Sequence, residues 1–202
     1  MLAQPPRRRL LLASASMSRA AVLRAAGIPF RRAPTDLDEA ALKARFRGPP
    51  PRLALALAHA KAERAAAHHK GDALILAADQ LLVCGGRLLD KARTQAEAKE
   101  QLRFLRGRRQ TMISGMALWH RGARVWEHTA SAQLAMRRFS DAVLDAYVRK
   151  EARYMTKILG GCRFEGPAPL LFDRIDGDYW TILGLPLLPL LPQLRRWRVL
   201  AE

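Results

Sequence analysis

The sequence predicts an α/β fold in which a mixed, twisted β-sheet is flanked by helices. Short apolar runs typical of buried strands alternate with segments of helical pattern along the 202 residues. Residues 110–136 alternate around Gly122, which indicates a long antiparallel hairpin. Half of the residues are hydrophobic, so the chain can bury a substantial core. Because there is no internal repeat and no long linker, we expect a single domain over residues 1–202, with residues 1–9 as a flexible basic N-terminus.

Strand runs and helix caps define the first third of the chain. Residues 10–13 are apolar enough for a buried strand. Ser16 or Ser18 can cap a helix that runs to Ala26, and Gly27 follows where glycine commonly ends a helix. Next we expect a short strand at residues 29–32, an acidic loop at 36–39, a proline-rich break at 48–51 and an alanine-rich helix at 53–68.

Asp79 lies between two apolar runs, residues 73–78 and 81–84, each of which predicts a buried strand. A carboxylate there is expected at a strand tip, where ligands gather in an open sheet. The dipeptide Gly85-Gly86 predicts a tight turn, and the returning strand would bring the ammonium group of Lys91 back towards Asp79. This pair indicates the start of a phosphate-handling site.

Capped helices and further strands complete the chain. Thr94 and Glu97 form a capping box for one helix. Ser140 can cap a second helix, and Pro186 suits the first turn of a final one. The remaining predicted strands span residues 110–120, 124–136, 170–172 and 179–183.

The formal net charge is +17, mostly from arginine. This favours polyanionic partners such as nucleotides, nucleic acid or an acidic membrane surface, although richness in arginine and alanine is equally typical of a GC-rich genome. Cys84 and Cys162 lack metal-ligand or disulfide spacing, which suits a reducing compartment. The basic start lacks the apolar stretch of a signal peptide, and no run is long enough to cross a membrane. We therefore expect a soluble, cytoplasmic protein.

Ser14, Ser16 and Arg19 lie at the junction between the first strand and the first helix. A helix N-terminus binds phosphate readily, because it presents free N–H groups and the positive end of the helix dipole. Taken alone, these residues fit an ordinary helix cap equally well. No P-loop and no dinucleotide-binding glycine motif is present, and the adjacent His68 and His69 fit the surface better than a catalytic role.

A series of separated motifs runs in order through nearly the whole chain. They are Leu-Ala-Ser-Ala-Ser at 12–16 with Arg19, Asp38-Glu39, Ala60-Lys61-Ala62, Ala78-Asp79-Gln80, Asp90-Lys91, Glu165-Gly166 and the closing stretch 175–187. Together they resemble the Maf family of nucleoside triphosphate pyrophosphatases. The resemblance implies an inosine-triphosphatase-like fold with two lobes around a nucleotide cleft, and it admits a homodimer.

The resemblance also implies a reaction, namely hydrolysis of a nucleoside triphosphate between its α and β phosphates. The cofactor would be a divalent metal ion such as Mg²⁺, Mn²⁺ or Co²⁺. In the family pattern Asp79 is the general base, and Glu39 and Asp79 hold the metal. Phosphoryl transfer needs mainly positioning and charge stabilisation, which such groups supply. The phosphate-binding residues implied by the same pattern are Ser14, Ser16, Arg19, Lys61 and Lys91.

Three residues mark the substrate class within this resemblance. Gln80 after the base, Glu165 and Ser18 are similar to the branch that acts on 7-methyl-GTP. A carboxylate such as Glu165 can accept from the N1–H and amino groups of guanine. The alternative is the branch acting on dTTP and UTP, which tends to have Thr after the base and Gln in place of the later Glu.

The chain departs from the family pattern at several positions. Met17 and Ala92 stand where proline is usual, and Gly161-Cys162 stands where a small residue and an aromatic are usual. The rival functions are a basic nucleic-acid-binding protein and a non-catalytic nucleotide sensor. An aromatic content of 6% argues against the first, because single-stranded nucleic acid is commonly held by stacking. Asp79 and Lys91 are both retained, which argues against the second.

Overall fold

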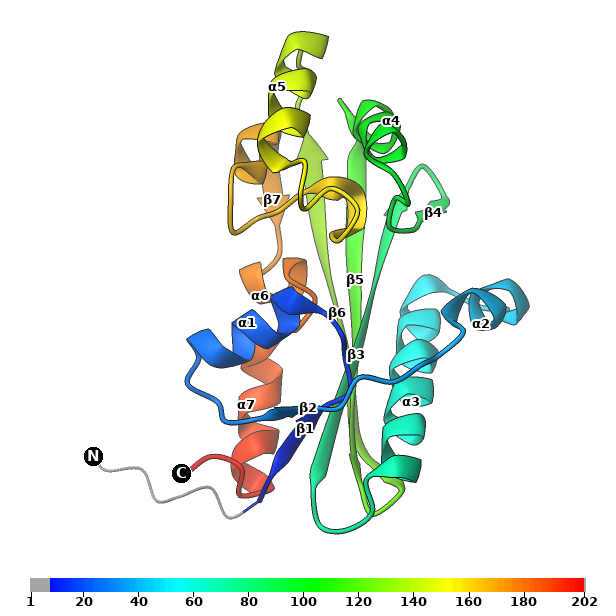
Figure 1. Ribbon diagram of the computed structural model, residues 1–202, viewed down its shortest axis with the longest axis vertical. Coiled ribbons are helices and arrows are strands. Elements are labelled where there is room, and N and C mark those ends of the chain that lie inside the picture. Colours follow the sequence, from blue (N-terminus) through cyan, green and yellow to red (C-terminus); the bar gives the residue numbers. More distant parts are fainter. Residues whose placement is uncertain (1–7, 202) are drawn as a thin grey trace. The chain divides into compact units, whose positions relative to one another are not determined.

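The computed structural model describes residues 8–201, which form a mixed sheet of seven strands flanked by helices (Figure 1). The strand order is β2-β1-β3-β5-β6-β7, and β4 pairs with β3. The pairs β1–β2 and β1–β3 are parallel, whereas β3–β4 and β6–β7 are antiparallel. The predicted fold class is therefore confirmed. Residues 1–7 of the predicted flexible N-terminus lie outside the described residues.

The elements have the following bounds. The strands are β1 (Leu10–Leu12), β2 (Arg31–Arg32), β3 (Leu74–Cys84), β4 (Arg87–Leu89), β5 (Arg109–His120), β6 (Ala123–Met136) and β7 (Phe172–Asp176). The α-helices are α1 (Met17–Ala25), α2 (Glu39–Arg45), α3 (Pro50–His68), α4 (Gln95–Leu105), α5 (Asp141–Glu151), α6 (Tyr179–Ile182) and α7 (Leu187–Arg196), and the short 3₁₀ helices are η1 (Leu159–Gly161) and η2 (Ala168–Leu171).

The chain divides into two compact units. Unit 1 contains residues 1–80, 114–130 and 179–202, and unit 2 contains residues 81–113 and 131–178. A division of this kind does not by itself distinguish the lobes of one domain from separate domains. The single domain over residues 1–202 therefore stays a prediction.

In unit 1, alternate side chains of the central strands enter two different cores, as the pleat of a strand requires. Leu12 and Leu76 pack with hydrophobic residues of α1 and α7. Ile75 and Ala77 face the opposite way and pack against alanines of α3. Figure 1 accordingly shows α3 on one side of these strands, and α1 and α7 on the other.

Three helices begin at the caps that the sequence predicts. The side-chain oxygens of Ser16, Thr94 and Ser140 accept hydrogen bonds from backbone N–H groups three residues further on, over 3.3, 3.1 and 3.4 Å. Each bond satisfies one of the donors left free at a helix start. The starts of α1, α4 and α5 are therefore set by local sequence.

Two expected elements are wrong, and one helix was not expected. Residues 36–38 form a loop as predicted, but Glu39 begins α2, and Asp38 caps this helix by accepting from the N–H of Ala41 over 2.9 Å. Residues 179–183 begin with the short helix α6 instead of a strand. Residues 170–171 belong to η2, and β7 starts only at Phe172. The last two errors share a cause, since a brief apolar run fits a strand and a short helix equally well.

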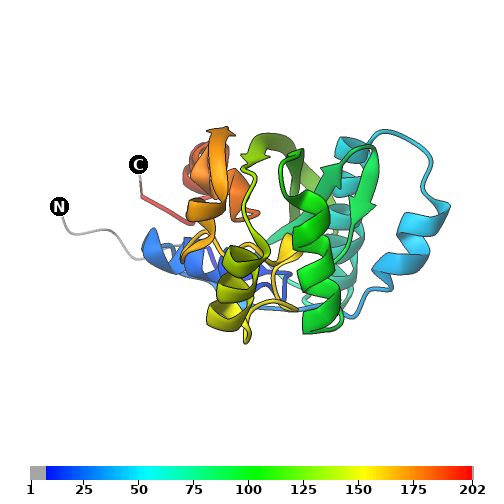
Figure 2. The same cartoon turned by 90° about the horizontal axis from the view of Figure 1, so that it is seen from above.

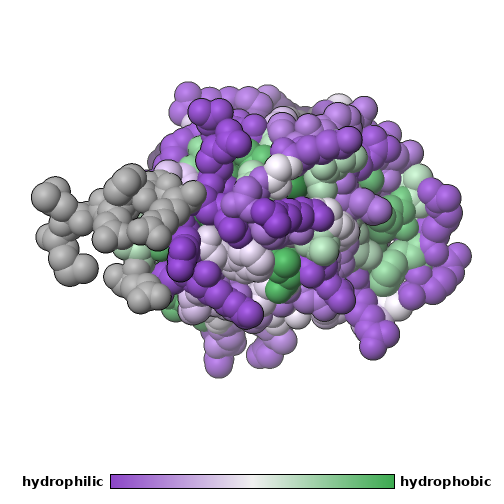
Figure 3. Space-filling model, turned by 90° about the horizontal axis from the view of Figure 1, so that it is seen from below, coloured by the Kyte–Doolittle hydropathy of each residue, from purple (hydrophilic) through white to green (hydrophobic). Residues whose placement is uncertain are grey.

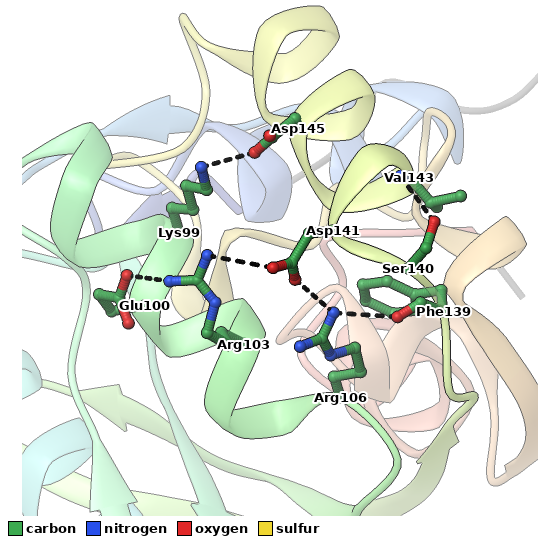
Figure 4. A network of polar contacts seen from close by, with 9 residues as sticks. All are labelled: Lys99, Glu100, Arg103, Arg106, Phe139, Ser140, Asp141, Val143 and Asp145. Atoms are coloured by element: carbon green, nitrogen blue, oxygen red, sulfur yellow. Dashed lines mark hydrogen bonds and ion pairs between the residues drawn. The ribbon is translucent and has the colours of Figure 1, made fainter.

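In unit 2, α4 and α5 lie side by side, as the view from above shows (Figure 2). Ion pairs join the two helices (Figure 4). Lys99 contacts Asp145 over 2.5 Å, and Asp141 contacts both Arg106 over 2.7 Å and Arg103 over 3.9 Å. These bonds neutralise the basic face that α4 turns towards α5.

The surface seen from below is mainly hydrophilic, with small separate hydrophobic patches (Figure 3). Among the described residues, no helix combines the length and the apolar character needed to cross a bilayer.

Candidate active site

Asp79 lies inside β3, which is one continuous strand where the sequence predicts two. The predicted strand tip is therefore wrong. The apolar residues on both sides of Asp79 are buried in the same sheet, so the chain has no reason to break there. However, the parallel neighbour β1 ends at Leu12, which is paired with Leu76. Asp79 thus lies just beyond the carboxyl end of the neighbouring strand, which is the environment in which open sheets bind ligands.

The ammonium group of Lys61 joins two carboxylates from different elements. Its Nζ lies 2.7 Å from Oε1 of Glu39 on α2 and forms an ion pair with Oδ1 of Asp79 on β3. The side chains of Lys61 and Asp79 are only 10% and 6% exposed. An unpaired charge at such depth would cost several kcal/mol. The Lys61 ammonium therefore holds both carboxylates close together.

The charge state of Glu39 follows from its neighbours. Burial by itself raises the pKa of its carboxyl group, but the positive charges of Lys61, Lys43 and Arg19 outweigh burial, and the pKa lies below its ordinary value. Nζ of Lys43 is 3.9 Å from Oε2 of Glu39. Glu39 is consequently ionised at neutral pH.

The loop between β1 and α1 orders the guanidinium group of Arg19. Nη1 of Arg19 donates to Oγ of Ser14 over 3.0 Å, and Nε donates to the carbonyl of Gly184 over 2.9 Å. The same Ser14 oxygen accepts from the N–H of Ser16 over 3.2 Å. Burial lowers the pKa of Arg19, whereas the carboxylates of Asp79 and Glu39 oppose that effect. Arg19 thus presents a fixed positive charge beside the N-terminus of α1.

Gln80 holds the chain segment at α6. Its Nε2 donates to the carbonyls of Thr181 and Ile182, each over 2.9 Å. Oγ of Ser114 donates to the same Thr181 carbonyl over 3.0 Å. A Cβ atom on Gly184, whose φ is +84°, would lie 3.1 Å from Oε1 of Gln80. The amide group of Gln80 therefore fixes the position of this segment directly. Ser114 and Gly184 also contribute to these contacts, and the sequence did not single out either residue.

Another residue missed from the sequence is Arg32 on β2. Its Nη2 donates to the carbonyl of Ala15 over 2.6 Å, which brings a further cation to the loop between β1 and α1. Pairing β1 with β2 places it there. No motif signals this contact, because an exposed arginine on a short strand is common.

The remaining expected site residues are distributed as follows. Ser18 is half-buried on the first turn of α1 in unit 1. Lys91 and Glu165 are exposed and belong to unit 2. Lys91 follows β4, which pairs antiparallel with β3 after the predicted turn, where Gly85 and Gly86 have φ of +57° and +75°. The convergence of Lys91 and Glu165 with Asp79 stays a prediction.

The unusual Gly160-Gly161-Cys162 segment has a local structural reason in unit 2. Gly160 and Gly161 both have positive φ, of +66° and +65°. A Cβ atom on Gly160 would lie 2.7 Å from Cδ2 of Leu82, and the Tyr147 hydroxyl donates to the Gly161 carbonyl over 2.9 Å. Burial raises the pKa of the Cys162 thiol to about 12. This stretch is therefore tightly packed, with its cysteine neutral.

The carboxylate pair fits a hard divalent cation. Among residues 8–201, no group of three or more His, Cys, Asp or Glu side chains is placed to hold a metal ion. Mg²⁺ is commonly bound through only one or two carboxylates, with substrate phosphates and water completing its shell. Glu39 and Asp79 meet at the Lys61 ammonium, so their oxygens already share one cation. Two carboxylates of this kind would suffice to hold one divalent cation together with substrate phosphates.

Buried charges of both signs beside the carboxyl end of β1 are typical of a protein that handles phosphate esters or anhydrides. Residues 9–197 match the family model described as "Maf-like protein", and the chain belongs to the Maf family. The predicted family is thus confirmed.

Individual comparisons agree with this family. A protein of Maricaulis maris named nucleoside triphosphate pyrophosphatase is 43% identical over 96% of this chain and 99% of its own. A protein of Rhizobium meliloti named 7-methyl-GTP pyrophosphatase is 40% identical over 92% of this chain and 94% of its own. A solved HAM1 protein of Coxiella burnetii is 17% identical and covers 65% of this chain and 74% of its own, with a TM-score of 0.41.

Proposed function

We propose that this chain hydrolyses the α–β phosphoanhydride bond of a nucleoside triphosphate, releasing a nucleoside monophosphate and pyrophosphate. Membership of the Maf family and the names of its relatives support an enzyme of this class, a hydrolase of phosphoanhydrides. The single observation that carries the proposal is the contact of the buried Lys61 side chain with both Asp79, which is buried too, and the partly exposed Glu39. A purely structural core does not need a buried lysine beside a buried aspartate, because charged groups are costly to bury.

In the proposed reaction Asp79 takes the proton of the attacking water. The water oxygen bonds to the α-phosphorus, and the bridging oxygen leaves with pyrophosphate. Positive charge around the phosphates offsets the negative charge that builds up on the leaving group. That charge would come from Arg19, Lys61 and the N-terminus of α1, with Lys91 joining them if the two units bring it near.

Glu39 and Asp79 are the residues we propose for holding the divalent metal. When bound, the metal supplies charge neutralisation and acidifies coordinated water. The Lys61 ammonium contacts both carboxylates. When metal and substrate bind, this ammonium is positioned to leave the carboxylates and to contact a phosphate oxygen instead. Measuring pyrophosphate release with Mg²⁺, Mn²⁺ and Co²⁺ in turn determines which ion supports the reaction best.

For substrate we propose a preference for 7-methyl-GTP over dTTP and UTP. Support comes from Gln80, from Glu165 and from the relative of Rhizobium meliloti whose name states that substrate. The amide donors of Gln80 are engaged with backbone carbonyls, so we propose that Gln80 acts by fixing the segment at α6. Reading the guanine edge is then left to the exposed Glu165. The alternative is a dTTP and UTP pyrophosphatase of the same family.

The test is a nucleotide panel with Glu165→Gln. Pyrophosphate release is measured from 7-methyl-GTP, GTP, dTTP and UTP, with Glu63→Gln as a matched control on the exposed face of α3. One bidentate base contact is worth about 1–3 kcal/mol, so the kcat/KM ratio of 7-methyl-GTP to dTTP should fall roughly 5- to 150-fold in Glu165→Gln. The control should keep the wild-type ratio.

Other outcomes of this panel distinguish the proposed substrate preference from the proposed pyrophosphatase activity. A wild-type preference for dTTP, or an unchanged ratio in Glu165→Gln, would overturn the 7-methyl-GTP assignment and leave the pyrophosphatase standing. No pyrophosphate from any nucleotide with any of the metals would favour a nucleotide sensor or a nucleic-acid-binding protein. Cytoplasmic location and a homodimer are kept as further predictions.

A further inference from the structure

A strongly basic hollow lies wholly within unit 2. Its cavity measures about 540 Å³, in the size range of pockets that hold small ligands. It is formed by the loop after α4, the start of β5, the end of β6 and the start of β7. Its charged lining consists of Arg108, Arg109, Arg137, Arg138 and Asp173.

The positive charge of this hollow is not neutralised by ion pairs among the described residues. Among residues 8–201, none of its four arginines forms an ion pair with a carboxylate. The neighbouring basic side chains of α4 differ, because Lys99, Arg103 and Arg106 are paired with Asp145 and Asp141 (Figure 4). Clustered like charges repel one another, so an arrangement of this kind gains stability when an anion binds.

Several of the arginines are held in place before any ligand binds. The guanidinium of Arg108 lies 4.2 Å from the ring centroid of Phe104. Nε of Arg137 donates to the carbonyl of Leu170 over 2.8 Å. Arg138 packs over Gly107, where an added Cβ would come within 2.9 Å of Cγ of Arg138. Binding therefore costs less side-chain entropy than it would with free arginines.

The donor groups of the hollow favour a phosphate chain that carries no nucleobase. Guanidinium groups match the geometry of phosphate oxygens and bind them through paired N–H donors. Two aromatic rings beside these arginines already carry two arginines each: Arg87 and Arg108 lie over Phe104, and Arg106 and Arg137 over Phe139. Stacking of a nucleobase on these rings is thus disfavoured.

We propose that this hollow is a binding site for a short inorganic phosphate chain of the size of pyrophosphate or tripolyphosphate. Asp173 lies in the same lining and opposes the anion, which limits affinity. The proposal concerns unit 2 alone and does not depend on hydrolysis at Asp79.

Calorimetry tests the site with the full chain and tripolyphosphate in metal-free buffer. Arg108→Gln/Arg138→Gln is compared with Arg149→Gln/Lys150→Gln, which has the same net charge and changes two exposed residues of α5. Each exposed contact between an arginine and the phosphate chain changes the Kd about 1.4- to 5-fold. The Kd of Arg108→Gln/Arg138→Gln should therefore rise roughly 2- to 25-fold, whereas the Kd of the control should stay within about 1.4-fold of the wild-type value. Asp173→Asn should bind about 1.4- to 5-fold more tightly.

Three results would overturn the proposal. The first is equal weakening by both double variants, which would indicate a diffuse effect of net charge. The second is a loss of nucleotide hydrolysis in parallel with a loss of tripolyphosphate binding, which would assign the arginines to the reaction site. The third is much tighter binding of a single-stranded RNA oligonucleotide than of tripolyphosphate, lost in Arg108→Gln/Arg138→Gln, which would indicate a nucleic-acid surface. Thermal unfolding of each variant checks that the fold is retained.

Discussion

Replacing Asp79 by Asn separates the chemistry of the site from its architecture. Asn is nearly isosteric with Asp and still offers an oxygen to the Lys61 ammonium, but it cannot take a proton. Lys61 keeps its second partner, since Oε1 of Glu39 lies 2.7 Å from Nζ. Lys61 is therefore not left as an unpaired buried charge in this variant, so the fold should persist.

The two expected effects of Asp79→Asn differ in size. Loss of a general base typically slows turnover about 10²- to 10⁴-fold. At 1.36 kcal/mol per tenfold, this range corresponds to roughly 2.7–5.4 kcal/mol of activation free energy. The Lys61 ammonium keeps a hydrogen bond to the neutral Asn oxygen but loses its ion pair with a carboxylate, so the free energy of unfolding should fall by about 1 kcal/mol.

The assay is kcat for pyrophosphate release at saturating nucleotide and Mg²⁺, with urea unfolding measured on the same samples. Glu63→Gln, an exposed change on the helix that carries Lys61, serves as the control and should match wild type. A kcat of Asp79→Asn within a few-fold of wild type would refute the reasoning. Glu39 would then be the first candidate for the base.

Three further predictions concern stability and reactivity. Gly184→Ala should lower the free energy of unfolding by more than Gly27→Ala: both positions have positive φ, which costs about 1–2 kcal/mol, but only at Gly184 would the methyl group meet side-chain atoms. Cys84 and Cys162 should react with a thiol reagent at pH 8 only after unfolding, because burial raises the pKa of both thiols. Asp141→Asn should destabilise the protein at pH 5–7 and lose this effect below about pH 4, since the hydrogen bond from its arginine partner lowers the carboxyl pKa.

Each of these has a clear contrary result. Equal unfolding free energies for the two glycine variants would mean that the contacts beside Gly184 adjust without cost. Rapid labelling of folded protein would show that a cysteine is accessible in the native state. For Asp141 the sign is fixed: a depressed pKa stabilises the fold above the unfolded-state value and loses that contribution as pH falls. An Asp141→Asn effect that does not decrease as the pH falls below about 4 would therefore contradict a role for ionisation.

Much of the candidate site is readable from residue order. An Asp between two apolar runs identifies Asp79 directly, whereas Ser14 and Lys61 are identified through the resemblance of their motifs to the Maf family. The structure brings Lys61, Asp79 and Glu39 into contact, although they are far apart in the chain. Sequence order cannot show that Asp79 lies inside a strand, because the strand continues only where neighbouring strands pair with it.

The sequence alone determined the α/β class, the family and the helix starts at Ser16, Thr94 and Ser140. The helix starts were predictable because they depend on local interactions. Caps and turns depend on residues within a few positions of one another, so they can be recognised from the sequence without knowledge of the fold. Tertiary structure alone decided how the segment at α6 is held by Gln80 and Ser114, and which arginines of unit 2 lack a carboxylate partner within the described chain. These features arise from contacts between distant segments, and charge pairing depends on distance in space.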